Sequence, residues 1–82
     1  MTTRPVIAKK GGKATRIYRS LAATQRDGFD PSTVSKVLRG DRDTHNDCTF
    51  TNYRGNASRL MDVMGSREMI TVQVAAKAGV RV

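Results

Sequence analysis

The amino-acid sequence predicts one small α+β domain over residues 1–82, and three observations support this prediction. A chain of 82 residues is long enough for one domain and too short for two. Short segments with β-branched or alternating residues occur near both ends, as expected of strands. Between them, residues 20–40 contain the capping residues and the apolar spacing of two short helices.

The first predicted element is an N-terminal β-hairpin. Residues 5–8 are typical of a short strand, and proline is tolerated at its first position. The segment from Lys9 to Lys13 predicts a turn, since its paired glycines can adopt the positive φ that tight hairpins need. Residues 15–19, which carry β-branched and aromatic side chains, predict the second strand.

Two short helices are expected after the hairpin. Ser20 is a suitable N-cap for a helix over residues 21–27, which would end at Gly28. A second helix is predicted for residues 31–39, because a capping residue, a proline at the first position and a terminal glycine frame it: Asp30, Pro31 and Gly40. Its apolar residues share one face by their spacing: Val34, Val37 and Leu38.

The C-terminal extension, residues 51–82, is expected to be rich in strands. An extended segment over residues 48–53 leads into it, and Asn56 can cap a brief helix over residues 57–64. Apolar and polar residues alternate from Met69 to Val74, which predicts a strand with Ile70, Val72 and Val74 on one face. Residues 80–82 are expected to form a last short strand.

Positive charge is concentrated at one end of the chain. The net charge is +8, and residues 1–26 contain seven Lys or Arg residues and no acid. A concentrated basic segment is the electrostatic footprint expected for nucleic acid. A merely solvated surface is the alternative, whereas binding to an anionic membrane would need an amphipathic helix with a broad apolar face, which the sequence does not contain.

The two helices around a glycine-centred turn predict a helix-turn-helix that binds DNA. Residues 28–40 resemble the recognition-helix region of lactose-repressor-type domains. Residues 5–50 are similar to the small DNA-binding module repeated in the tails of phage and intron-encoded homing endonucleases. Six positions carry this second resemblance: Tyr18, Ser20, Leu21, Val34, Gly40 and Phe50. It implies a DNA-binding module of phage or mobile-element type without the nuclease.

The hypothesis is therefore a small basic protein that binds double-stranded DNA, as a transcriptional regulator of a phage or mobile element. Base contacts in the major groove are expected from the outward face of helix 31–39: Ser32, Thr33, Ser35, Lys36 and Arg39. Phosphate contacts are expected from the hairpin and from the loop after that helix: Lys9, Lys10, Lys13, Arg16, Arg19 and Arg42. A homodimer is expected, with residues 69–74 as the candidate contact.

No enzymatic activity, metal site or cofactor is expected. Four side chains alternate like the first ligands of a calcium loop: Asp41, Asp43, His45 and Asp47. The glycine and glutamate that such a loop needs are replaced by Asn46 and Asn52. His45 and Cys48 are too few ligands for zinc. The single cysteine fits a reducing cytoplasm, so a bacterial or phage-infected cytoplasm is the expected location.

Other functions stay open at this point. A small viral-type factor could inhibit a host enzyme by occupying its nucleic-acid-binding or acidic surface, and the strand at residues 69–74 would offer it an edge for pairing. RNA binding is less favoured, because the chain has few aromatic side chains for stacking.

Overall fold

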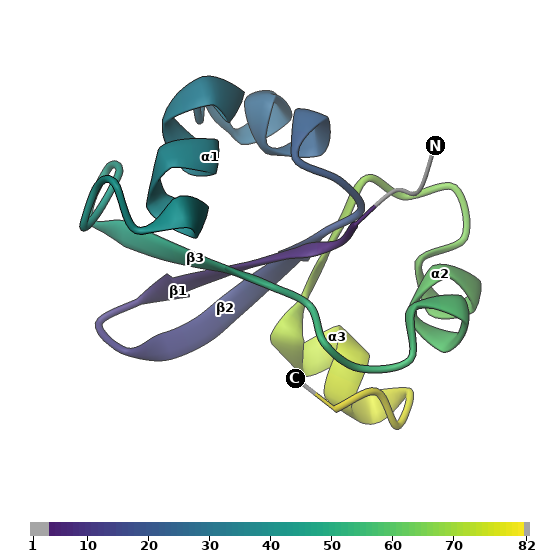
Figure 1. Ribbon diagram of the computed structural model, residues 1–82. Helices are drawn as coiled ribbons and strands as arrows, with labels where there is room; N and C mark the ends of the chain where they lie inside the picture. The colour runs from purple at the N-terminus through teal and green to yellow at the C-terminus, as the bar shows by residue number, and fades with distance from the viewer. Residues whose placement is uncertain (1–3, 82) are drawn as a thin grey trace.

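A four-stranded antiparallel sheet with the strand order β3-β1-β2-β4 forms the centre of the structure, a computed structural model that describes residues 4–81 (Figure 1). Helices lie on both faces of this sheet, so the α+β class is confirmed. In chain order the elements are β1 (Val6–Lys10), β2 (Lys13–Tyr18), the 3-10 helix η1 (Ala22–Asp27), α1 (Pro31–Arg39), β3 (Cys48–Asn52), α2 (Ala57–Met64), β4 (Met69–Thr71) and α3 (Val72–Lys77).

The predicted hairpin forms, and its strands reach further into the turn than expected. Gly11 and Gly12 alone connect β1 to β2, with φ of +60° and +83°. Both values lie in the left-handed region, where glycine carries no steric penalty. One extra residue, Thr15, bulges from β2, and its hydroxyl donates to the carbonyl of Ala8 at 3.2 Å.

The second predicted helix begins and ends where its capping residues require. The carboxylate of Asp30 accepts the backbone N–H of Ser32 at 3.1 Å, and Gly40 ends α1 with φ of 84°. The first helix is a short 3-10 helix instead of an α-helix. It begins at Ala22, one residue later than predicted, so Leu21 and not Ser20 is at the N-cap. Ser20 Oγ still accepts the N–H of Ala23 at 3.3 Å, and Gly28 ends η1 with φ of 87°, as predicted.

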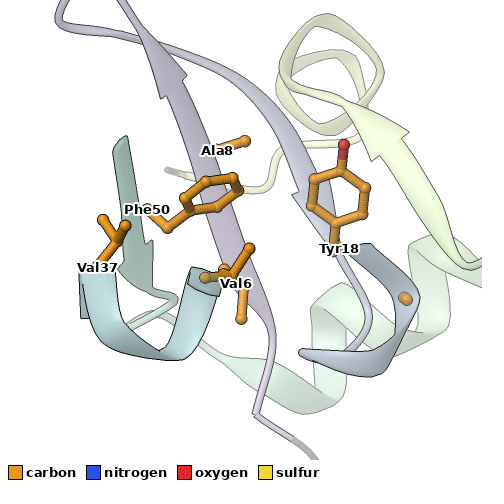
Figure 2. Close-up of a cluster of buried hydrophobic side chains, with 7 residues drawn as sticks. Val6, Ala8, Tyr18, Val37 and Phe50 are labelled. Atoms are coloured by element: carbon orange, nitrogen blue, oxygen red, sulfur yellow. The ribbon is translucent and has the colours of Figure 1, made fainter. Parts of the chain in front are cut away.

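Two separate apolar cores lie on opposite faces of the sheet, because successive residues of a strand point to opposite sides. Under η1 and α1, the first core consists of Val6, Ala8, Tyr18, Ala23, Val34, Val37 and Phe50. Figure 2 shows the Phe50 ring over β1, between the sheet and α1. Under α2 and α3, the second core consists of Ile7, Ile17, Leu60, Met64, Ile70, Ala75 and Val80.

The predicted C-terminal strand forms as β4, but α2 and α3 account for more of residues 51–82 than strands do, so this extension is not rich in strands. The chain pairs with β2 only from Met69 to Thr71, and α3 starts at Val72. The hydroxyl of Thr71 accepts the N–H of Val74 at 3.3 Å, which is an N-cap contact. Helical backbone then places Ala75 in the second core and leaves Val74 38% exposed, so the expected common face of Ile70, Val72 and Val74 does not exist.

The end of α3 shows why the last predicted strand does not begin at Val80. Gly79 has φ of 82°, and the N–H of Val80 donates to the carbonyl of Ala75 at 2.9 Å. This geometry is that of a Schellman motif, in which the residue after the glycine folds back onto the apolar side of the helix. Val80 is therefore buried in the second core, and residues 80–81 are not a strand. Val82, the last residue of the predicted strand, lies outside the described residues.

Candidate nucleic-acid interface

The outward face of α1 is polar, and its inward face holds it in place. Val34 is fully buried and Val37 almost so, and both contribute to the first core. Leu38 packs against the same core while staying partly exposed, so the predicted apolar face is confirmed. On the opposite side, Lys36 and Arg39 are exposed. The helix that carries these long polar side chains is thus held in place by its buried face.

Four of the five predicted base-contacting residues line one shallow groove of about 400 Å³. They are Ser32, Ser35, Lys36 and Arg39, and Leu21 and Pro31 complete the lining. The lining side chains, all of them in the described part of the chain, include no acid. Sequence reasoning missed the place of Leu21 here, because its contact with the groove depends on how η1 crosses α1.

Thr33, the fifth predicted residue, lies apart from this groove. Its hydroxyl donates to the carboxylate of Asp30 at 3.0 Å, and Asp30 also accepts the backbone N–H of Ser32. Thr33 therefore strengthens the N-cap of α1. A hydroxyl that is bonded to the N-cap stabilises the start of the helix instead of contacting a ligand.

One exposed ion pair lies at the C-terminal end of the groove. Arg39 Nε is 3.4 Å from a carboxylate oxygen of Asp41, and the two side chains are 62% and 64% exposed. A pair this exposed contributes little to stability. It does lower the positive potential at Arg39, and a phosphate or a base would compete with Asp41 for the guanidinium.

The pleat of the sheet separates the basic residues of the hairpin. Lys10 and Lys13 are cross-strand partners on the α1 face, as are Ala8 and Arg16. Lys9 points to the other face and lines a different groove. Figure 1 shows the hairpin tip at the same end of the sheet as the loop between α1 and β3. Only part of the predicted phosphate-contacting set is thus brought to one side of the sheet with α1.

Arg16 takes part in a polar network beside η1. Its guanidinium lies 2.8 Å from Asp27 Oδ2, and the Tyr18 hydroxyl donates to the same oxygen at 2.6 Å. Burial raises the pKa of Tyr18 to about 12, and the hydrogen bond to Asp27 acts in the same direction. Asp27 therefore links β2 to η1, and Arg16 is already paired with an acid.

A cavity of about 360 Å³ lies between this network and the hairpin. Its lining combines charged groups with apolar and aromatic ones, among them Lys10, Arg16, Asp27 and Phe29. Asp27 adds a negative charge to this lining, which disfavours a bound phosphate. The cavity is bounded by the hairpin, the end of η1 and the start of β3, and we assign no ligand to it.

Arg19 has a different environment from the other predicted phosphate-contacting residues. It follows β2 on the second face of the sheet, where its guanidinium donates to the carbonyl of Arg67 at 3.0 Å and to the carbonyl of Gly65. These carbonyls follow the last residues of α2, a position where a cation is favourable. Arg19 thus joins β2 to the end of α2, far along the chain.

The loop after α1 is ordered by its own contacts. Asn46 and Asp47 both have positive φ, which asparagine and aspartate tolerate better than most residues, and form a two-residue turn closed by hydrogen bonds between His45 and Cys48. His45 Nε2 also accepts the N–H of Asp30 at 3.1 Å. Arg42 Nε donates to the carbonyl of Thr44 at 2.7 Å, and the side chain stays exposed.

Residues 4–81 contain neither a cluster of metal-ligating side chains nor a helix that could span a membrane. No three His, Cys, Asp or Glu side chains in this range gather closely enough to hold a metal ion. None of the helices described over the same range has the length and apolar character needed to cross a bilayer. Comparison of the chain with protein-family models, curated proteins and solved structures gave no match.

Proposed function

We propose that the protein binds double-stranded DNA and reads the major groove with α1. The observation that carries this proposal is the groove lined by Ser32, Ser35, Lys36 and Arg39. Such side chains suit direct readout, because arginine and lysine donate to guanine O6 and N7, and serine hydroxyls can pair with either kind of base edge. A helix held by caps and by a buried face presents these groups with little loss of conformational freedom.

Phosphate contacts would come from the hairpin tip and from the loop after α1. Lys10 and Lys13 are exposed cross-strand neighbours on the α1 face, and Arg42 lies close behind the end of α1 in the chain. Flexible ammonium groups suit a phosphate backbone, where a point charge is sufficient. The basic composition of the chain supports the same proposal, with a role as a phage or mobile-element regulator.

The first experiment selects bound sequences from a pool of random duplexes and then measures affinity on one selected and one scrambled duplex. Lys36→Ala and Arg39→Ala should each cost about 1–3 kcal/mol on the selected duplex and much less on the scrambled one. Lys10→Ala and Lys13→Ala should weaken both complexes alike and reduce the salt slope by about one per contact. Lys77→Ala, on the other side of the sheet, is the charge control.

Two results would contradict the proposal. The first is equal loss of affinity on both duplexes when Lys36 or Arg39 is replaced, because α1 would then not read the sequence. The second is failure of the unmodified protein to retain any duplex at moderate salt. Retention without a reproducible selected motif would restrict the function to binding without sequence preference.

We expect the DNA-bound unit to be a homodimer, because one helix of this length reads roughly three or four base pairs. The edge of β4 is the proposed contact, although it offers only three residues, Met69–Thr71, for pairing. Sedimentation of the protein, free and on saturated DNA, measures the state. A free species of 9.0 kDa, together with a single chain on each saturated duplex, would contradict the dimer.

A further inference from the structure

A second basic groove lies on the face of the sheet that α1 does not cover. It has a volume of about 410 Å³, and its charged lining residues are Lys9 from β1, Arg54 from the loop after β3, and Arg81 from the segment after α3. Tyr53 forms part of the wall. Among the described residues that line this groove there is no aspartate or glutamate. Three parts of the chain thus bring cations together around one aromatic side chain.

The position of Tyr53 is held by its surroundings. Its backbone N–H donates to the carbonyl of Pro5 at 2.9 Å, and its ring packs against the second core while staying partly exposed. Gly55 is needed for this arrangement, because an added Cβ would lie 2.6 Å from Tyr53 Cζ. A side chain at position 55 would therefore displace the ring from the wall of the groove.

The three cations of this groove are available to a ligand. The ion pairs formed within residues 4–81 use other cations, Arg16 and Arg39. Arg59, which is near in the fold, instead donates to the carbonyl of Ala78 at 3.2 Å and so has a structural contact. Like charges gathered in this way repel one another, and a bound anion would relieve this repulsion.

We propose that this groove binds a single-stranded segment of nucleic acid, with its phosphates on Lys9, Arg54 and Arg81 and one base stacked on Tyr53. Single-strand sites combine basic grooves with exposed aromatic rings, on which bases of any sequence can stack. A duplex fits this wall less well, because its base faces are already stacked inside the helix. The proposal does not depend on duplex binding by α1, since the two surfaces lie on opposite faces of the sheet.

The test is a fluorescence-anisotropy titration of labelled oligothymidylate of about ten nucleotides, a length in the usual range for one such site. Replacing Arg54 and Arg81 together by alanine should lower the affinity about tenfold and reduce the salt slope by about 1.4. The control that removes the same charge elsewhere combines Arg26→Ala with Lys77→Ala, and it should keep most of the affinity. Circular dichroism melts establish that each variant is folded.

Stacking is tested separately from charge. Tyr53→Leu should weaken oligothymidylate binding by at least about fivefold, whereas Tyr53→Phe should keep it. An abasic oligomer of equal length carries the same phosphates without bases, so Tyr53→Leu should not change its affinity. Because the chain has no tryptophan, a Tyr18→Phe background leaves Tyr53 as the sole tyrosine, and its fluorescence should be quenched by the oligomer.

Three results would overturn the proposal. The first is an oligothymidylate affinity that does not change in the Arg54 and Arg81 variant. The second is an affinity that falls equally when Lys36 and Arg39 are replaced, because the strand would then occupy the α1 groove. The third is equal binding of the abasic oligomer together with no effect of Tyr53→Leu, which would make the groove a phosphate site only. Loss of duplex binding alone would contradict the proposed function and leave this site intact.

Discussion

Replacing Val34 by alanine tests how α1 is held against the sheet. The Val34 side chain is 0% exposed and lies in the first core, between α1 and the strands. The substitution removes two carbon atoms, worth about 0.8 kcal/mol each in transfer free energy. The cavity that remains adds to this loss, so we expect a decrease of about 2–3 kcal/mol in the free energy of unfolding. For a domain of this size, that is a large part of the total stability.

The assay is urea unfolding followed by far-UV circular dichroism, in which the midpoint should fall and the slope should stay unchanged. Two other positions of α1 provide a graded comparison. Leu38→Ala should lower the free energy of unfolding by less than the same replacement does at a fully buried site, because Leu38 is only partly buried. Ser35→Ala, on the outward face, should change stability by no more than about 0.5 kcal/mol, since alanine is the better helix former.

A result in which Val34→Ala and Ser35→Ala have the same midpoint would refute this reasoning. It would mean that α1 does not pack on the sheet through Val34. The reading surface of the proposed DNA complex would then lack its rigid support, and the expected sequence preference of Lys36 and Arg39 would lose its physical basis.

Three more outcomes follow from the polar contacts. The pKa of Tyr18 is raised to about 12, above about 10 in the unfolded chain. The free energy of unfolding should therefore fall as the pH rises between these values, by at most about 1.4 kcal/mol per pH unit. Urea unfolding of Tyr18→Phe at several pH values should lack this pH dependence. Asp41→Asn should tighten duplex binding at low salt by freeing Arg39, and an unchanged affinity would contradict the competition inferred between Asp41 and the duplex. Arg19→Ala should cost about 1–2 kcal/mol in a thermal melt by removing its hydrogen bonds to the carbonyls that follow α2, while leaving the salt slope of duplex binding unchanged.

The outward face of α1 shows how far local reasoning could go. Asp30, Pro31 and Gly40 determine the bounds of this helix through contacts within a few residues, so the sequence was sufficient to predict it. The grouping of four polar residues along one side followed from the helical period. The sequence did not predict that Thr33 would contact Asp30 instead of joining that group, because a hydroxyl at this position can face either way.

Alternation of residues was misleading in the C-terminal extension. The sequence from Met69 to Val74 has the period of a strand, yet Thr71 caps a helix that starts at Val72. Short apolar segments fit either structure by pattern alone, and tertiary packing decides between them. Here β2 offers a partner to only three residues of β4, and the second core receives Ala75 and Val80 from a helical turn.

The sequence by itself determined the elements whose signals are local: the glycine turn of the hairpin, the caps of α1 and α2, and the excess of positive charge. Tertiary structure alone decided which cations share a surface. Lys9 and Lys10 are adjacent in the chain, but the pleat sends them to opposite faces, and Lys9 meets Arg54 and Arg81 only when distant segments pack together. Caps act over a few bonds, whereas a binding surface depends on which distant segments fold against one another.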